Sequence, residues 1–104
     1  MVGSVLLGLL LIMGVEAGNT IDFSGYVWNV KSGVGGPGPN NWDAQSDAVF
    51  VDEEGLHLTV GLREGKWYSS EVYLPQSLGY GTYEFEIGSD VTAVDTNLVG
   101  AVFL

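Results

Sequence analysis

The sequence predicts an antiparallel β-sandwich, and three observations support that prediction. Short alternating or β-branched segments recur at about ten-residue spacing, separated by turns rich in glycine, asparagine and aspartate. After an N-terminal apolar segment, no helical periodicity of useful length follows. The final segment, from Leu98 to Leu104, is apolar throughout and reads as a buried strand. Since its side chains and edge then need a covering layer, we expect an incomplete sandwich.

Residues 1–17 have the pattern of a secretory signal peptide. The apolar run from Val5 to Val15 has 11 residues, which is too short for a membrane helix of about 20. Small side chains at Val15 and Ala17 suit a signal peptidase, although no Lys or Arg precedes the run. We predict cleavage after Ala17, with an uncleaved anchor as the alternative. The folded part is then residues 18–104, secreted or at the cell surface.

The charge balance excludes nucleic acid and anionic membranes as partners. Without residues 1–17 the formal net charge is −9 on 87 residues, and the cations are Lys31, Arg63 and Lys66. These three cannot form the basic stripe that phosphates require. The acidic character favours solubility. There is no cysteine, so stability must come from core area, a metal or a partner.

The first half of the folded part predicts strands around a loop. Residues 21–31 indicate one or two strands, and Gly25 interrupts them where a bulge or a close backbone approach would fit. Residues 32–41 contain four glycines, two prolines and two asparagines, which predicts a long shaped loop without strand or helix. A linker is the alternative. Too few residues precede this loop to form a domain, so we expect it to lie over a sheet.

Residues 48–52 and 56–62 predict a hairpin. Its turn, residues 52–55, ends in Gly55, which supplies a positive φ. His57 falls on the face opposite Leu56 and Leu58, as a strand surface residue. It is the only histidine, and without a second imidazole or a cysteine no zinc-type centre is expected.

Residues 66–74 and 81–87 predict two further alternating strands. On the first, Trp67, Glu71 and Tyr73 share one face. On the second, Glu84 and Glu86 alternate with aromatic side chains and are expected to face solvent.

Five segments occur in an order and spacing that are specific in combination. They are Trp28-Asn29-Val30, Gly36-Pro37-Gly38-Pro39-Asn40-Asn41, the hairpin 49–58, Trp67-Tyr68-Ser69-Ser70-Glu71-Val72 and Leu78-Gly79-Tyr80-Gly81-Thr82-Tyr83-Glu84-Phe85. Through them the chain, from about Trp28 to Phe103, resembles the N-terminal half of glycoside hydrolase family 16, the laminarinase and lichenase type of β-glucanase. The resemblance implies a concanavalin-like β-jelly-roll sandwich, and hydrolysis or transglycosylation of β-linked polysaccharide by two carboxylates.

The family's catalytic strand, with two acids at alternating positions, has no counterpart in this sequence. A retaining enzyme needs its two carboxylates about 5 to 5.5 Å apart across one face. Glu84 and Glu86 have the right spacing, but they fall on an earlier strand of the family pattern. We therefore assign no catalytic residue. The chain is expected to be an exported fragment of such a hydrolase, inactive alone.

The resemblance also implies a sugar-binding set. An asparagine after the glycine-rich loop reaches the sugar, and both Asn40 and Asn41 match that place. Trp67 matches an aromatic position that can stack on a pyranose. Turn capping by the asparagines and core packing of the tryptophan are the rival readings. Glu71 stands where laminarinase-like members often have arginine, which puts their substrate preference in doubt. The predicted set is Asn40, Asn41, Trp42, Trp67 and Glu71.

Two other classes of function stay open. A non-catalytic carbohydrate-binding module would use the same five residues. An interaction protein would complete its sandwich with another chain, including a second copy, through the edge at residues 98–104. Family members can bind calcium, but no stretch has the spaced oxygen ligands of a calcium loop. We assign no metal and no cofactor.

Overall fold

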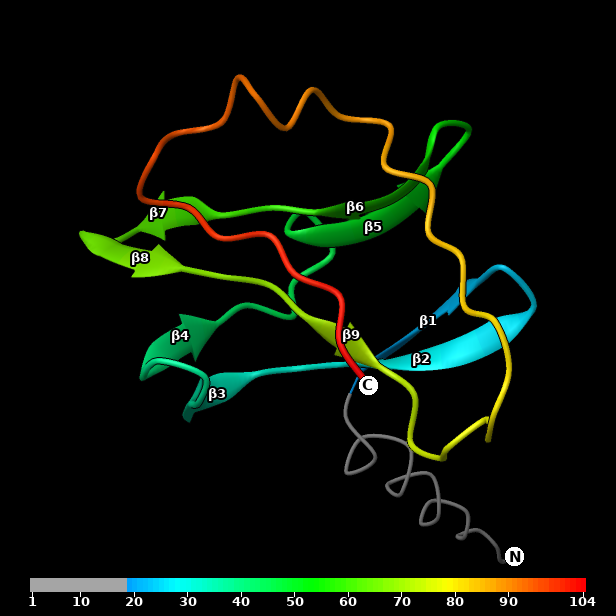
Figure 1. Cartoon of the computed structure of the whole chain (residues 1–104). Helices are drawn as coiled ribbons and strands as arrows, with labels where there is room; N and C mark the ends of the chain where they lie inside the picture. The colour runs from blue at the N-terminus through cyan, green and yellow to red at the C-terminus, as the bar shows by residue number, and fades with distance from the viewer. Residues whose placement is uncertain (1–18) are drawn as a thin grey trace, which may run out of the picture.

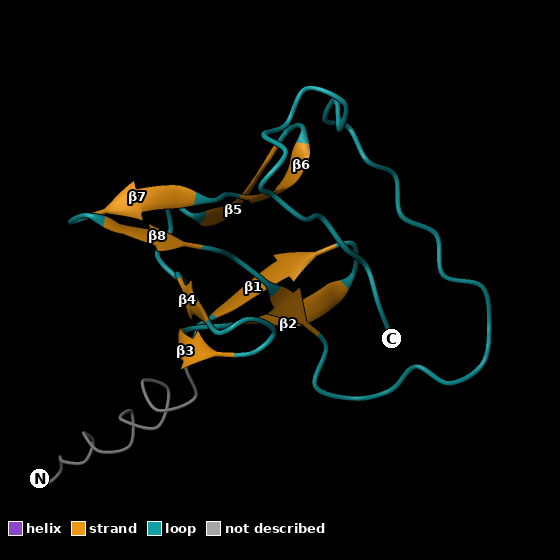
Figure 2. Cartoon of the chain, turned by 60° about the vertical axis from the view of Figure 1, so that its left-hand side comes forward, coloured by secondary structure: helices purple, strands orange, loops and turns teal. Residues whose placement is uncertain are grey.

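A computed structural model describes residues 19–104, and the predicted signal peptide lies outside them. The described chain is all-β, with antiparallel strand pairs and no helix (Figure 1, Figure 2). Within that range no helix is long and apolar enough to span a membrane.

Eight of the nine strands within residues 19–104 form four consecutive hairpins, and the ninth returns to the first hairpin. The hairpins are β1–β2, β3–β4, β5–β6 and β7–β8, while β9 pairs with β2 to give the order β1-β2-β9. The strands are β1 Thr20–Phe23, β2 Tyr26–Val30, β3 Gly33–Gly35, β4 Asn40–Trp42, β5 Val49–Asp52, β6 Gly55–Leu58, β7 Gly61–Arg63, β8 Lys66–Tyr68 and β9 Val72–Tyr73.

Residues 21–31, predicted to form one or two strands, lie in the two strands of the β1–β2 hairpin. Phe23 pairs with Tyr26 around a two-residue turn. Ser24 and Gly25 both have positive φ, 56° and 84°, as a tight primed hairpin turn requires. The prediction of a bulge at Gly25 was wrong, because this glycine forms the turn itself.

The prediction that residues 32–41 form a loop without strands was also wrong. Gly33 pairs with Trp42 and Gly35 pairs with Asn40, which makes β3–β4 a short hairpin. The Trp42 indole donates a hydrogen bond to the Gly35 carbonyl at 2.9 Å. Glycine and proline therefore fill the turn at residues 36–39, while this cross-strand contact closes the hairpin.

The β5–β6 hairpin confirms the prediction for residues 48–62 at its turn. Asp52 pairs with Gly55, and the φ of Gly55 is 126°. The second predicted strand is observed as two, β6 and β7, which Thr59 and Val60 separate. There the Thr59 N–H and hydroxyl both donate to the Ala48 carbonyl, at 3.0 and 2.9 Å.

The hydrophobic core is small and lies between the β1-β2-β9 sheet and the β5–β6 hairpin. Val30, Ala48 and Val49 are buried at its centre. Partly buried apolar side chains pack around them from β1, β6, β9 and the segment before β5, namely Ile21, Ala44, Leu56 and Val72.

Residues 74–104 contain no strand, so the strands predicted at 81–87 and 98–104 were wrong. Val99 is 90% exposed and Leu104 is 97% exposed. The segment runs as one long irregular stretch past the hairpins (Figure 1). Its backbone bonds are local, from Ala93 to Asp90 and from Leu98 to Asp95. Alternation yields a strand only where a neighbouring strand accepts its hydrogen bonds, and β1 to β9 pair only among themselves.

Candidate functional site

The β3–β4 and β7–β8 hairpins meet where β4 lies beside the end of β8. The Ser69 N–H donates to the Asn41 carbonyl at 2.8 Å, and the Asp43 N–H donates to the Ser69 carbonyl at 2.9 Å. We call this place the β4–β8 junction, defined by Asn41, Trp42, Trp67 and Ser69 (Figure 1, left). The predicted strand 66–74 is interrupted here, because Ser69 to Glu71 turn away from β7 to bond with β4 and with Lys31.

Lys31 holds the inner side of the junction together. Its ammonium nitrogen lies 4.4 Å from the ring centroid of Trp42 and 3.2 Å from Glu71 Oε1. It also donates a hydrogen bond to the Gly36 carbonyl. Sequence reasoning named Lys31 only as one of three cations among 13 acidic residues. That scarcity is the one sequence signal that could have pointed to a paired cation.

Two of the predicted sugar-binding residues face this inner side. Trp42 is 8% exposed, so core packing describes it better than a stacking platform. Glu71 forms the ion pair with Lys31, and both side chains are largely covered. The Glu71 carboxylate is therefore neutralised by Lys31, which directly follows β2.

The two asparagines have different partners. Asn40 donates its side-chain amide to the Pro37 carbonyl at 2.7 Å, which caps its own turn. A Cβ at Gly38 would lie 2.6 Å from that amide nitrogen, so the turn requires glycine there. Asn41 instead donates to the Trp67 carbonyl at 3.1 Å, across the junction. Asn41 is thus the asparagine that the fold places beside the aromatic position.

Trp67 presents its indole to solvent on β8. The residue is 66% exposed, and its cross-strand partner Leu62 is 57% exposed on β7. Tyr68 takes the opposite face and is half-buried. The alternation predicted for this segment thus holds at Trp67 and Tyr68. The Trp67 indole is exposed on β8, next to the strand β4 that contains Asn41.

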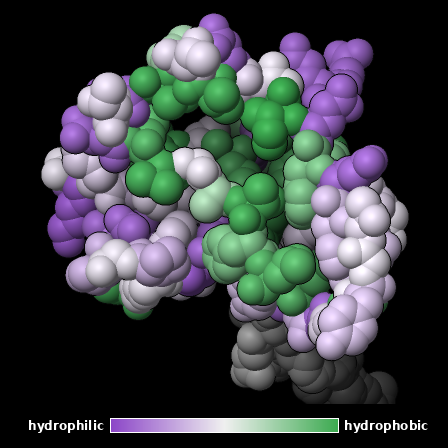
Figure 3. Space-filling model, in the orientation of Figure 1, coloured by the Kyte–Doolittle hydropathy of each residue, from purple (hydrophilic) through white to green (hydrophobic). Residues whose placement is uncertain are grey.

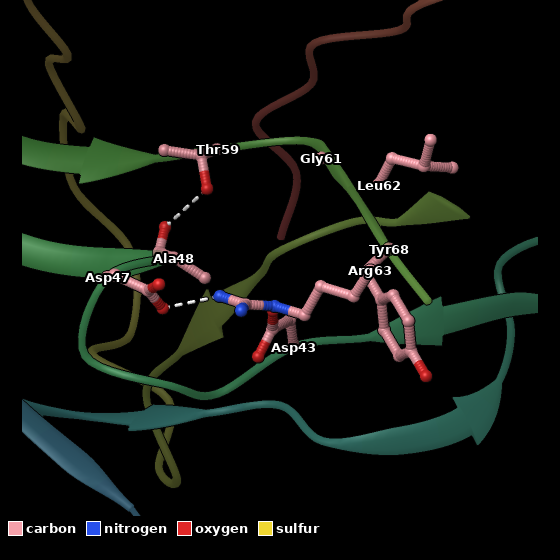
Figure 4. Close-up of a pocket in the computed structure, with 8 residues that line it drawn as sticks. All are labelled: Asp43, Asp47, Ala48, Thr59, Gly61, Leu62, Arg63 and Tyr68. Atoms are coloured by element: carbon pink, nitrogen blue, oxygen red, sulfur yellow. Dashed lines mark hydrogen bonds and ion pairs between the residues drawn. The ribbon is translucent and has the colours of Figure 1, made fainter. Parts of the chain in front are cut away.

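A polar pocket lies on the Tyr68 side of the same hairpin (Figure 4). The Arg63 guanidinium points between the carboxylates of Asp43 and Asp47 and pairs with both. Burial would raise the pKa of Asp43, but hydrogen bonds from the Gln45 N–H and Arg63, with the charge of Arg63, outweigh it and lower that pKa. This cluster ties β7 to the segment before β5, and no sequence motif predicted it.

The remaining sequence candidates lie apart from the junction. Glu84 and Glu86 are both exposed, as expected, but on irregular backbone instead of a strand. His57 is half-buried beside Asp52 on the β5–β6 hairpin. Hydrogen bonds from His57 and from the Glu54 N–H lower the pKa of Asp52.

No family model, curated protein or solved structure matches this chain. The resemblance to glycoside hydrolase family 16 therefore depends on the sequence segments quoted above.

Proposed function

We propose that this chain is the polysaccharide-binding part of an exported, family 16-like glycoside hydrolase with a β-jelly-roll sandwich fold, acting on β-linked glucan. One observation carries the proposal. Trp67 has an exposed indole, and its main-chain carbonyl accepts a hydrogen bond from Asn41, one of the two asparagines that match the family's sugar position.

The chemistry of the junction suits a pyranose. A flat aromatic ring stacks on the CH face of a β-linked glucose, and Leu62 widens the apolar surface next to it. The Asn41 amide N–H is already bonded to the Trp67 carbonyl, so its oxygen is the atom that can accept from a sugar hydroxyl. Trp42, Asn40 and Lys31 act as supports of this geometry.

Hydrolysis is not assigned to residues 19–104. A retaining mechanism needs one carboxylate as nucleophile and another as acid, facing each other across the bond. Asp43 and Asp47 are both paired with Arg63. Glu84 and Glu86 lie on exposed irregular backbone. The proposal therefore places the catalytic carboxylates outside the described residues, and this chain binds glucan without cleaving it.

Affinity electrophoresis in gels containing laminarin or lichenan tests the proposal. The purified chain should be retarded, and Trp67→Ala should bind about tenfold more weakly, because a lost stacking contact costs about 1.4 kcal/mol. Tyr80→Ala is the matched control, since Tyr80 is a fully exposed aromatic residue away from the junction. Equal retardation of both variants, or any release of reducing ends by the chain, would contradict the proposal.

A second candidate, an interaction protein, is favoured by the apolar side chains of residues 85–104. Figure 3 shows apolar side chains gathered over the middle of one face. Sedimentation of the purified chain tests this candidate, and a monomer at all concentrations would remove it. The exposed apolar residues are Phe85, Ile87, Val91, Val94, Leu98, Val99, Val102, Phe103 and Leu104.

A further inference from the structure

The turn of the β5–β6 hairpin brings together three side chains that can bind a metal. One ligand atom each from Asp52, Glu54 and His57 lie within 4.8 Å of one another. His57 Nε2 is 2.8 Å from Asp52 Oδ1 and 3.9 Å from Glu54 Oε1. The sequence has no second imidazole and no thiolate, so its pattern predicts no zinc site, but zinc also takes carboxylate ligands.

The imidazole is held in place by a contact outside the cluster. His57 and Phe50 are cross-strand partners, and their rings stack with centroids 4.5 Å apart and planes 9° apart. This stacking fixes the ring so that Nε2 points at the turn carboxylates. The Asp52 carboxylate is also fixed, because it accepts the Glu54 N–H at 2.8 Å. Binding a cation would therefore cost little side-chain entropy at His57 and Asp52, whereas the exposed Glu54 side chain would have to be ordered.

We propose that Asp52, Glu54 and His57 form a binding site for a divalent transition metal, with Zn²⁺ as the best-fitting ion. One imidazole nitrogen and two carboxylate oxygens are ligands that zinc accepts, whereas calcium takes oxygen ligands. Three protein ligands leave further positions for water. The net charge of −10 attracts cations to the whole surface. The test must therefore distinguish binding at these three residues from nonspecific attraction of cations.

Calorimetric titration of the purified chain with ZnCl₂ in a non-coordinating buffer tests the site. The expected result is one Zn²⁺ per chain, with binding weakened at least about tenfold in His57→Gln. Glu53→Gln is the matched control, because it removes the same charge from the same turn outside the cluster, and it should bind as the wild type does. Glu54→Gln repeats the test without altering packing, since the Glu54 side chain is 84% exposed.

A second readout uses the single histidine of the sequence. Zn²⁺ should shift the imidazole NMR resonances of His57 at one equivalent, while Ca²⁺ at the same concentration should not. Three results would each overturn the proposal: absence of saturable Zn²⁺ binding, equal weakening by Glu53→Gln and Glu54→Gln, or full binding by His57→Gln. The last two would indicate cation attraction by acidic charge alone.

Discussion

At the scale of single residues, Lys31 is the side chain on which the junction depends most. It covers the Trp42 ring, pairs with Glu71 and bonds the Gly36 carbonyl, so it joins β2, β4 and the segment before β9. A desolvated cation over an indole and a charge-assisted hydrogen bond each contribute about 1 kcal/mol or more. Lys31 is therefore a structural residue of the junction.

Replacing this cation should destabilise the fold measurably. We expect Lys31→Ala to lower the free energy of unfolding by about 2 kcal/mol, because it removes the contacts with the Trp42 ring and the Gly36 carbonyl and leaves Glu71 unpaired. Urea unfolding followed by circular dichroism measures the change. Lys66→Ala, at an exposed position on β8, is the control and should cost less than about 0.5 kcal/mol. Equal effects of the two variants would show that the Lys31 contacts add no stability.

The lowered pKa of Asp43 predicts a dependence of stability on pH. An unfolded aspartate has a pKa of about 3.9, and the folded-state pKa of Asp43 lies below its ordinary value. The stabilising contribution is therefore present above the unfolded pKa and is lost as pH falls through the folded pKa. Asp43→Asn should be less stable at neutral pH and should lose less stability than the wild type on acidification.

The measurement is the free energy of unfolding as a function of pH. Asp22→Asn changes an exposed aspartate on β1 and serves as the control. Its free energy of unfolding should fall at low pH as that of the wild type does. If Asp43→Asn lost as much stability at low pH as the wild type, Asp43 would not contribute to the pH dependence.

At the scale of elements, the residues of a turn predict a hairpin, whereas the other strands depend on pairing with segments distant in the sequence. The glycine of the β5–β6 turn predicts that hairpin because its backbone requirement is local. Residues 32–41 mislead because composition carries no signal for the Trp42 indole bond that closes β3–β4. Residues 81–87 and 98–104 have strand patterns, but a pattern cannot name the partner strand. The resemblance implies that Trp67 and either Asn40 or Asn41 contact the sugar, but it does not choose between the two asparagines, and the structure joins Asn41 to Trp67. The ion pairs of Lys31 with Glu71 and of Arg63 with Asp43 join residues 40 and 20 positions apart, which no local pattern predicts.

The β5–β6 turn offers a direct test of a local rule. Gly55 has a φ of 126°, where side chains are strained, although a Cβ there would meet nothing within 4 Å. Gly55→Ala should therefore lower the free energy of unfolding by about 1 kcal/mol or more through backbone strain alone. Gly61→Ala is the matched control, since Gly61 has open space and no positive φ. Thermal unfolding compares the melting temperatures of the two variants. An unchanged melting temperature in Gly55→Ala would contradict the strain argument.

At the scale of the whole molecule, a small core supports hairpins and a long segment with many exposed apolar side chains. Within residues 19–104 the buried apolar side chains are Val30, Trp42, Ala48 and Val49, while residues 85–104 expose many others. A fold with so little buried area has low stability. Its melting temperature should therefore respond clearly to a ligand that binds only the folded state.

The most direct test of the central claim is calorimetric melting of the purified chain with increasing laminarin. If β-linked glucan binds through Trp67, the melting temperature of the wild type should rise with ligand concentration and that of Trp67→Ala should rise far less. A wild-type melting temperature that stays constant up to saturating laminarin and lichenan would contradict the claim. An equal rise in the two proteins would place the glucan site elsewhere than the β4–β8 junction.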